Sequence, residues 1–212
     1  EKVVGSWLGV LDRSGISGEV VVTDDGSTDR TRSILQKMAA ADPRVRLVVA
    51  PENGGYGRAL RQAIAAARGD FVVTIDSDGQ FDPEDIPRLL ECQRRGDFDL
   101  VTGFRSKKHD TPLRVAADLG LRSFVRQLFG LRLRDPNCAL KLMRREWVQG
   151  AKLEAEGYPT PTEIMVRAHH EGLQVAEVGV SHLSRAGGAS KLGLVRTALD
   201  ASQFLIRLRL RL

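Results

Sequence analysis

The chain has few cysteines, few aromatic residues and no long apolar run, and each shortage excludes a class of protein. Its two cysteines, Cys92 and Cys138, offer no disulfide framework, which favours a reducing compartment. Aromatic residues make up 5% of the sequence, which gives no support to base-stacking nucleic-acid binding, so we expect no nucleic-acid partner. No signal peptide opens the chain, and no run of about 18 apolar residues is present to span a membrane. We therefore expect a cytoplasmic protein.

The bulk properties that remain are those of one globular domain over residues 1–212, with 42% hydrophobic and 28% charged residues. A formal charge of +5 suits an anionic partner such as a nucleotide or a phospholipid surface. The C-terminal residues 204–212 are apolar and cationic only. Two readings stay open for residues 192–212: the end of an amphipathic helix that packs on the domain, or a juxtamembrane helix on a lipid surface.

The first half of the sequence alternates strand-like and helix-like segments. Apolar runs predict strands at 19–23, 45–50, 71–75 and 99–102. Helices are predicted at 28–41, from the end of a glycine-rich turn at 53–57 to about residue 68, and at 82–96. Asp82 is expected to cap the last of these helices, with Pro83 at its first position. This order predicts an α/β fold with a mostly parallel sheet flanked by helices. In the second half we expect helices at 113–129, 162–171 and 194–212, with strands at 139–143 and 174–180.

Acidic residues follow two of these strands, at Asp24-Asp25 and at Asp76-Ser77-Asp78. Ligands of open α/β sheets bind beyond the carboxyl ends of the strands. Asp76, Asp78 and Gln80 form an oxygen donor set suited to Mg²⁺ or Mn²⁺, which would leave coordination positions for the phosphates of a substrate. Taken alone, the same pattern is more often that of a solvated Asp/Gly turn.

Several segments surround this cluster in a particular order. They are Val20-Val-Val-Thr-Asp-Asp-Gly-Ser-Thr-Asp29, Asn53-Gly-Gly-Tyr-Gly-Arg-Ala59, Ala67-Arg-Gly-Asp70, Gly103-Phe-Arg105, Arg134-Asp-Pro-Asn-Cys-Ala-Leu-Lys141, His182-Leu-Ser-Arg185 and Gly188-Ala-Ser-Lys191. In this order they resemble family-2 glycosyltransferases of the GT-A fold. The resemblance is greatest to the polyprenyl-phosphate sugar transferases related to dolichol-phosphate mannose synthase, and it covers nearly the whole chain.

The resemblance implies a set of site residues. Asp25 would contact the nucleotide of the donor, while Asp76, Asp78 and Gln80 would form the donor and metal site. The phosphates of donor and acceptor would be bound by Arg105 and Arg185, with Lys191, Arg114 and His182 as further contacts to phosphate. Glu163 matches an acidic position of the family, which either acts as a base or orients the acceptor or Arg185.

The activity implied is inverting transfer of a hexose from a GDP- or UDP-sugar to polyprenyl phosphate, by a peripheral enzyme at the cytosolic membrane face. A phosphomonoester is already mostly dianionic at pH 7, so it needs no dedicated base. Two alternatives stay open. Transfer to a sugar hydroxyl of a glycan would require Glu163 as base, and a non-catalytic nucleotide-binding module would require none of this chemistry.

The chain departs from the family at two places. Relatives begin with a strand that carries a Pro-x-Tyr-Asn-Glu segment, and this chain starts after that point, so we expect the first strand to be missing from the sheet. Residues 137–141 read Asn-Cys-Ala-Leu-Lys where the mannosyl synthases have Thr-Ser-Gly-Phe-Arg. This second difference weakens any assignment of a particular sugar, while the class of enzyme is unaffected.

Overall fold

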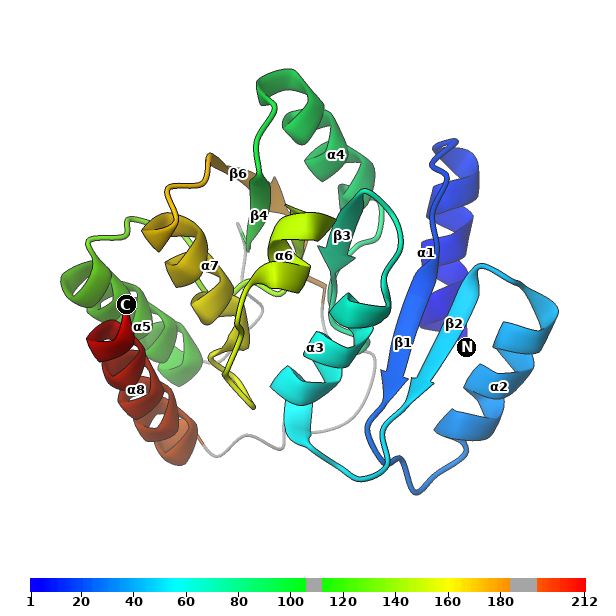
Figure 1. Ribbon diagram of the computed structural model, residues 1–212, viewed down its shortest axis with the longest axis horizontal. Coiled ribbons are helices and arrows are strands. Elements are labelled where there is room, and N and C mark those ends of the chain that lie inside the picture. Colours follow the sequence, from blue (N-terminus) through cyan, green and yellow to red (C-terminus); the bar gives the residue numbers. More distant parts are fainter. Residues whose placement is uncertain (106–111, 184–193) are drawn as a thin grey trace.

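The computed structural model describes residues 1–105, 112–183 and 194–212, which form an α/β fold (Figure 1). The first half of the chain contains α1 (Lys2–Arg13), β1 (Val20–Asp24), α2 (Thr31–Ala41), β2 (Val45–Val49), α3 (Gly55–Ala66), β3 (Phe71–Thr74), α4 (Asp85–Gly96) and β4 (Leu100–Arg105). The second half contains α5 (Pro112–Phe129), β5 (Lys141–Arg144), α6 (Arg145–Gly150), α7 (Thr160–His170), β6 (Val175–Val180) and α8 (Leu194–Arg211).

The strands fall into two sheets. β1 and β2 pair in parallel, with Val20 opposite Val45. The second sheet has the order β3-β5-β4-β6, in which β4 and β6 are parallel and β5 runs against both of its neighbours. The predicted α/β class is therefore confirmed, and β5 is the strand that makes this sheet mixed. β5 lies between β3 and β4, both of which precede it in the chain.

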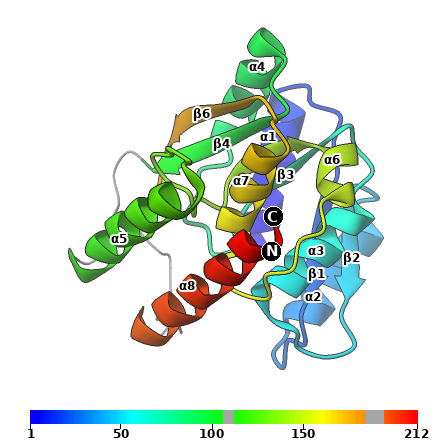
Figure 2. The same cartoon turned by 60° about the vertical axis from the view of Figure 1, so that its left-hand side comes forward.

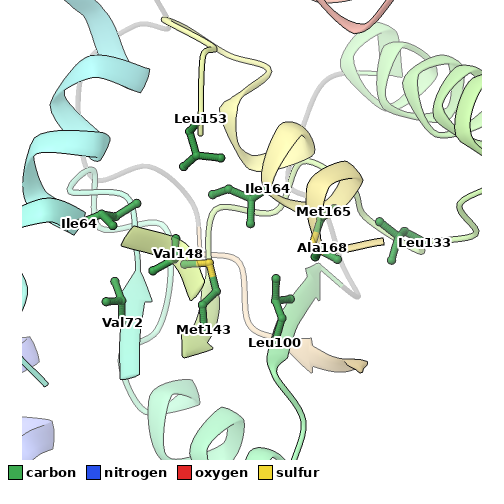
Figure 3. Close-up of a cluster of buried hydrophobic side chains, with 10 residues drawn as sticks. All are labelled: Ile64, Val72, Leu100, Leu133, Met143, Val148, Leu153, Ile164, Met165 and Ala168. Carbon is green, nitrogen blue, oxygen red and sulfur yellow. The ribbon is translucent and has the colours of Figure 1, made fainter. Parts of the chain in front are cut away.

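The four-stranded sheet has an apolar cluster on each face. On one face, residues of β3, β4 and β5 pack against α3, α6 and α7 (Figure 3). On the other face the next residue along each strand packs against Leu89 of α4. Leu100 and Val101 show the alternation, because they are neighbours in β4 and belong to opposite clusters. Burial on both faces explains why these strands read as continuous apolar runs.

The two sheets are separate, and residues of β1 and β3 line a gap between them. α1 and α2 cover one side of β1 and β2 through a core that includes Trp7, Leu35 and Val45. Among the described residues, no hydrogen-bonded pairing joins β1 to β3. Consecutive residues 20–23 of β1 and 71–74 of β3 line one cavity, so residues from both faces of each strand border it. That arrangement is what an unpaired strand edge gives.

The segments predicted from the sequence correspond to observed elements, with differences at their ends. The prediction placed Pro83 at the first position of α4, and this was wrong, because the helix begins at Asp85. The side chain of Asp82 accepts the backbone N–H of Glu84, so this segment forms a turn ahead of the helix. Helices α1 and α6 had no counterpart in the prediction. α1 lacks both an N-terminal side-chain cap and acidic residues in its first turn, so its sequence carries no start signal.

α5 and α8 lie side by side at one end of the molecule (Figure 2). Val125 of α5, Val166 of α7 and Leu205 and Leu208 of α8 form the buried cluster that joins them. Arg211 of α8 also pairs with Glu154. The packed helix end predicted for residues 192–212 is therefore observed over its described part. Within the ranges that the structure describes, none of the helices combines the length and the apolar character needed to cross a bilayer.

Candidate functional site

A single cavity of about 1390 Å³ connects three parts of the fold. One part is the gap between β1 and β3. The second part surrounds the ends of β1 and β3, where Tyr56, Asp76 and Asp78 line the wall. The third part, called the α5–α8 passage, is lined by Arg105 and by residues of α5 and α8. The acidic cluster predicted to bind the donor and the arginine predicted to bind a phosphate thus line the same cavity.

The two aspartates after β1 do different work. Asp24 is 2% exposed. Its carboxylate accepts the backbone N–H of Ser27 at 3.0 Å and the Nε–H of Arg32 at 2.5 Å, and its hydrogen bonds to Ser27 and Arg32 lower its pKa. Asp25 accepts the N–H groups of Gly54 at 2.9 Å and of Gly55 at 2.8 Å. The predicted nucleotide contact therefore also anchors the glycine-rich turn, and it fixes the start of α3.

That turn brings Tyr56 to the acidic cluster. The Tyr56 hydroxyl donates to Oδ1 of Asp76 at 3.0 Å, and the side chain still borders the cavity with 40% of the residue exposed. Desolvation in the cavity wall, followed by the negative charge of Asp76, raises the pKa of Tyr56 well above its ordinary value. The phenol therefore stays protonated and acts as a donor at neutral pH.

A short antiparallel contact closes the other side of the cluster. Phe81 forms a β-bridge with His182, and the backbone N–H of Leu183 donates to the carbonyl of Gln80 at 2.7 Å. The rings of Phe81 and His182 meet edge to face with centroids 5.5 Å apart. The structure thus places His182, 9% exposed, beside the Asp76-to-Gln80 segment although about a hundred residues separate them in sequence.

The donor set of this segment fits a hard divalent cation whose coordination is completed by substrate. Asp78 accepts the backbone N–H of Gln80 at 3.0 Å, and the side-chain amide of Gln80 donates to the Leu183 carbonyl at 3.3 Å. Among residues 1–105, 112–183 and 194–212, no group of three or more His, Cys, Asp or Glu side chains is placed to hold a metal. Two carboxylates and an amide oxygen are too few to enclose Mg²⁺ or Mn²⁺ alone, and they leave room for phosphate oxygens.

Arg105 is held between two carboxylates. Its Nε and Nη2 donate to Asp135 at 2.6 and 2.9 Å, and Nη2 lies 3.5 Å from Oδ2 of Asp118. Asp118 in turn accepts the Tyr158 hydroxyl at 3.5 Å. Burial alone would lower the pKa of Arg105, but the hydrogen bond and charge of Asp135 outweigh it and raise that pKa. The guanidinium is therefore permanently charged, with one buried partner and one partner on the cavity wall.

Glu163 is placed differently from its prediction as a catalytic residue. It is fully buried, and its carboxylate accepts the backbone N–H groups of Glu154 and Ala155 and the Nε–H of Arg167 at 2.7–3.0 Å. It is not among the described residues that line the cavity. The loop that it holds packs on the start of α3, where the Gly57 N–H donates to the Glu156 carbonyl at 2.7 Å. This placement favours a structural role and gives a base no access to an acceptor.

Below Arg105 lies a fully buried lysine. Lys141 Nζ donates to Thr102 Oγ1 at 2.9 Å, and burial lowers its pKa to about 8. Cys138 is also buried, and burial raises the pKa of its thiol to about 11. Neither side chain reaches the surface, so neither is placed to contact a substrate directly.

Three of the predicted phosphate-binding residues cannot be placed. Arg185 and Lys191 lie outside the described residues, and of Arg114 the structure describes the backbone as part of α5 but not the side chain. The residues that prediction missed are Tyr56, Asp118, Asp135 and Tyr158. Tyr56 and Asp135 lie inside segments already singled out by sequence. Asp118 and Tyr158 had no local signal, because only the fold brings them to Arg105.

The chain is similar in sequence to known glycosyltransferases. The model of the family "Glycosyl transferase family 2" matches residues 5–149. Undecaprenyl-phosphate 4-deoxy-4-formamido-L-arabinose transferase of Edwardsiella ictaluri is 31% identical over 191 residues, or 89% of this chain and 57% of that protein. Glycosyltransferase AglD of Haloferax volcanii is 34% identical over 200 residues, or 89% of this chain and 31% of that protein. The chain thus spans little more than half of the first relative and about a third of the second.

Solved structures share the fold. Glucosyl-3-phosphoglycerate synthase from Mycobacterium tuberculosis, in complex with phosphoglyceric acid, has a TM-score of 0.72 at 26% identity, covering 98% of this chain and 73% of that chain. The same enzyme with Mn²⁺, UDP and glucosyl-3-phosphoglycerate has a TM-score of 0.71 at 25% identity, with 99% and 75% covered. These likenesses confirm the predicted GT-A class of fold.

Proposed function

Because the chain belongs to glycosyl transferase family 2, we propose that it transfers a hexose from a GDP- or UDP-sugar to polyprenyl phosphate, with inversion at the anomeric carbon. The observation that carries the proposal is the continuity of the cavity from Asp76 and Asp78 to the passage between α5 and α8. The name of the undecaprenyl-phosphate relative supports a polyprenyl-phosphate acceptor. The Mn²⁺ and UDP bound to the structural relative support a nucleotide-sugar donor held with a divalent metal.

The donor end is formed by the residues after β1 and β3. Asp76, Asp78 and Gln80 would hold Mg²⁺ or Mn²⁺, which would neutralise charge on the donor's diphosphate as it leaves. Asp25 would contact the nucleoside of the donor, and the turn that it anchors carries Tyr56, which lines the cavity. Tyr56 fixes the Asp76 carboxylate, and the His182 segment closes over Gln80. The sequence likeness does not fix the sugar, because the named sugars are a formamido-arabinose in one relative and glucose in another.

The acceptor end is formed by Arg105 and the α5–α8 passage. Beside Arg105 and Asp118 the passage is lined mostly by apolar residues of α5 and α8, including Leu121, Phe124 and Ala201, with Thr197 and Ser202 of α8 as polar lining residues. A cation followed by an apolar channel matches a phosphate that carries a hydrocarbon chain. A small hydrophilic acceptor would make no apolar contacts with this part of the passage.

The chemistry needs no general base from this chain. A phosphate oxygen of the acceptor attacks C1 of the sugar, and the bond from C1 to the donor's β-phosphate oxygen breaks, so that the diphosphate leaves with the electron pair. The attacking oxygen carries no proton at neutral pH. Transfer to a sugar hydroxyl would require a base, and the expected candidate, Glu163, is buried against backbone N–H groups. The geometry therefore favours the phosphate acceptor over the hydroxyl acceptor.

The outer face of α8 supports work at a membrane surface. Leu199, Ile206 and Leu210 are 58%, 46% and 82% exposed, and their spacing places them on one stripe of the helix. Arg207 and Arg209 fall on either side of that stripe and are exposed. An apolar stripe with cations at its edges is typical of helices that lie in an anionic lipid interface. We therefore assign the protein to the cytosolic membrane face as a peripheral enzyme.

The test is a comparison of acceptors. The protein is first screened by thermal shift against GDP- and UDP-sugars with and without Mn²⁺. The stabilising donor is then incubated with undecaprenyl phosphate in detergent, with 3-phosphoglycerate, or with a free oligosaccharide. Nucleotide release that depends on undecaprenyl phosphate supports the proposal. Release with either hydroxyl acceptor but not with the lipid phosphate contradicts it, and binding without turnover on any acceptor indicates a nucleotide-binding module.

A further inference from the structure

Arg105 has two carboxylate partners that differ in geometry and in exposure. Asp135 makes two short contacts to the guanidinium, and its side chain is 4% exposed. Asp118 makes one contact of 3.5 Å, its side chain is 16% exposed, and it lines the cavity. Asp135 is thus a fixed partner, while Asp118 occupies the side of Arg105 that faces the passage.

These charges conflict with simple phosphate binding. Arg105 brings one positive charge, and the two aspartates bring two negative charges to the same place. Arg105 and Asp118 both border the cavity and Asp135 does not, so an acceptor phosphate that binds Arg105 from the cavity lies next to the Asp118 carboxylate. Two like charges at close range repel, so phosphate and Asp118 compete for one side of the guanidinium.

We infer that Asp118 is a built-in competitor that occupies the acceptor-phosphate position on Arg105, and that it selects for a dianionic acceptor. The inference rests on the proposed function, because it takes Arg105 as the acceptor's ligand. A phosphate dianion offers more charge and more acceptor oxygens than the single long contact of Asp118, and it displaces that contact. A neutral sugar hydroxyl has no charge with which to do so. The displaced carboxylate keeps the Tyr158 hydroxyl as a partner.

The competitor predicts a gain of affinity on substitution, which damage to the fold does not produce. Asp118→Asn keeps the size of the side chain and removes its charge. We expect the dissociation constant and the KM of undecaprenyl phosphate in detergent micelles to fall about threefold to fivefold, with kcat changed less than twofold. Asp118→Glu retains the charge, so neither constant falls. Asp12→Asn removes one exposed negative charge on α1 and controls for the change in net charge.

A further variant separates this inference from the proposed function. Arg105→Ala is expected to weaken undecaprenyl phosphate binding. If it does, and Asp118→Asn leaves binding unchanged or weaker, the competitor role is wrong while the acceptor site stands. If Arg105→Ala leaves binding unchanged, the acceptor assignment is wrong and the competitor role falls with it. Tighter binding in Asp118→Asn that is matched by Asp12→Asn also overturns the inference, since the cause is then net charge.

Discussion

The Tyr56 hydroxyl donates a hydrogen bond to Asp76 at 3.0 Å, and this contact joins the start of α3 to the end of β3. The same turn is fixed on its other side by Asp25, which accepts the N–H groups of Gly54 and Gly55. The glycine-rich segment therefore connects the two acidic clusters. It explains why a tyrosine stands between glycines at the edge of a charged site.

Removing that hydroxyl is expected to loosen the donor site without unfolding the protein. We predict that Tyr56→Phe raises the dissociation constant of UDP or GDP in the presence of Mn²⁺ about fivefold, because Asp76 loses a hydrogen bond that orients it. Calorimetry on the purified variant measures this. Tyr158→Phe is the matched control, since Tyr158 contacts Asp118 and not the donor cluster. Equal nucleotide affinity in Tyr56→Phe and the native protein would show that Asp76 needs no such support.

Glu163 is expected to act on stability and not on the chemical step. In Glu163→Gln the new NH₂ group meets backbone N–H donors that need an acceptor, so we predict a loss of about 3 kcal/mol in the free energy of unfolding. Urea denaturation measures the loss, with Glu156→Gln on the exposed part of the same loop as control. The pH profile of kcat for the folded variant should match that of the native enzyme. A shifted profile would mean that Glu163 is a base after all.

Lys141 makes a prediction about stability and pH. Burial lowers its pKa from 10.5 to about 8 in the folded protein, so the folded state disfavours the charged form. The cost is fully present below pH 8 and is relieved as the pH rises from about 8 toward the unfolded pKa near 10.5. Lys141→Met is therefore predicted to be more stable at pH 7 by about 1–3 kcal/mol.

The difference in unfolding free energy between Lys141→Met and the native protein should shrink between pH 8 and pH 10. Chemical denaturation across that range measures it, and Lys152→Met, at an exposed position, should show no such trend. A difference that stays constant with pH would mean that Lys141 is neutral throughout, or that its charge is compensated in the fold.

The exposed stripe of α8 is expected to bind lipid. We predict that the triple substitution Leu199→Gln, Ile206→Gln and Leu210→Gln lowers partitioning onto phosphatidylglycerol-containing vesicles at least about tenfold, while leaving the α5–α8 core intact. Val49→Gln, which changes an apolar residue on β2 that is 45% exposed, is the control. Sedimentation with vesicles measures the partitioning. Unchanged partitioning of the triple variant would assign membrane binding to another part of the surface.

The sequence was a good guide to elements with a strong local pattern. The apolar runs of β1 and β3 and the acidic residues after them predicted both the strands and the edge of the sheet where the site lies. The direction of β5 was not predictable, because a short apolar run predicts a strand but carries no information on its direction. The direction depends on the neighbouring strands in the folded sheet. α1 was also hidden, since it carries no start signal.

The site was predictable where chemistry is local and not where the fold supplies a partner. Asp76, Asp78 and Gln80 are close in sequence, so their cavity position followed from one turn. The two aspartates at the end of β1 could not be separated in advance, because their partners come from other segments: Asp24 pairs with Arg32, and Asp25 accepts N–H groups of the turn before α3. Glu163 was expected near substrate, yet the backbone of residues 154–155 takes its carboxylate into the core. Arg105 was expected to be free for phosphate, and its two carboxylates come from distant segments.

The central claim is tested most directly by nucleotide release with Asp78→Asn beside the native protein. The reaction contains the stabilising nucleotide sugar, Mn²⁺ and undecaprenyl phosphate in detergent. The account predicts that the native protein releases UDP or GDP only when both the metal and the lipid phosphate are present, and that Asp78→Asn lowers the rate at least about a hundredfold. Full turnover by Asp78→Asn, or native turnover that persists after chelation of the metal, would contradict it.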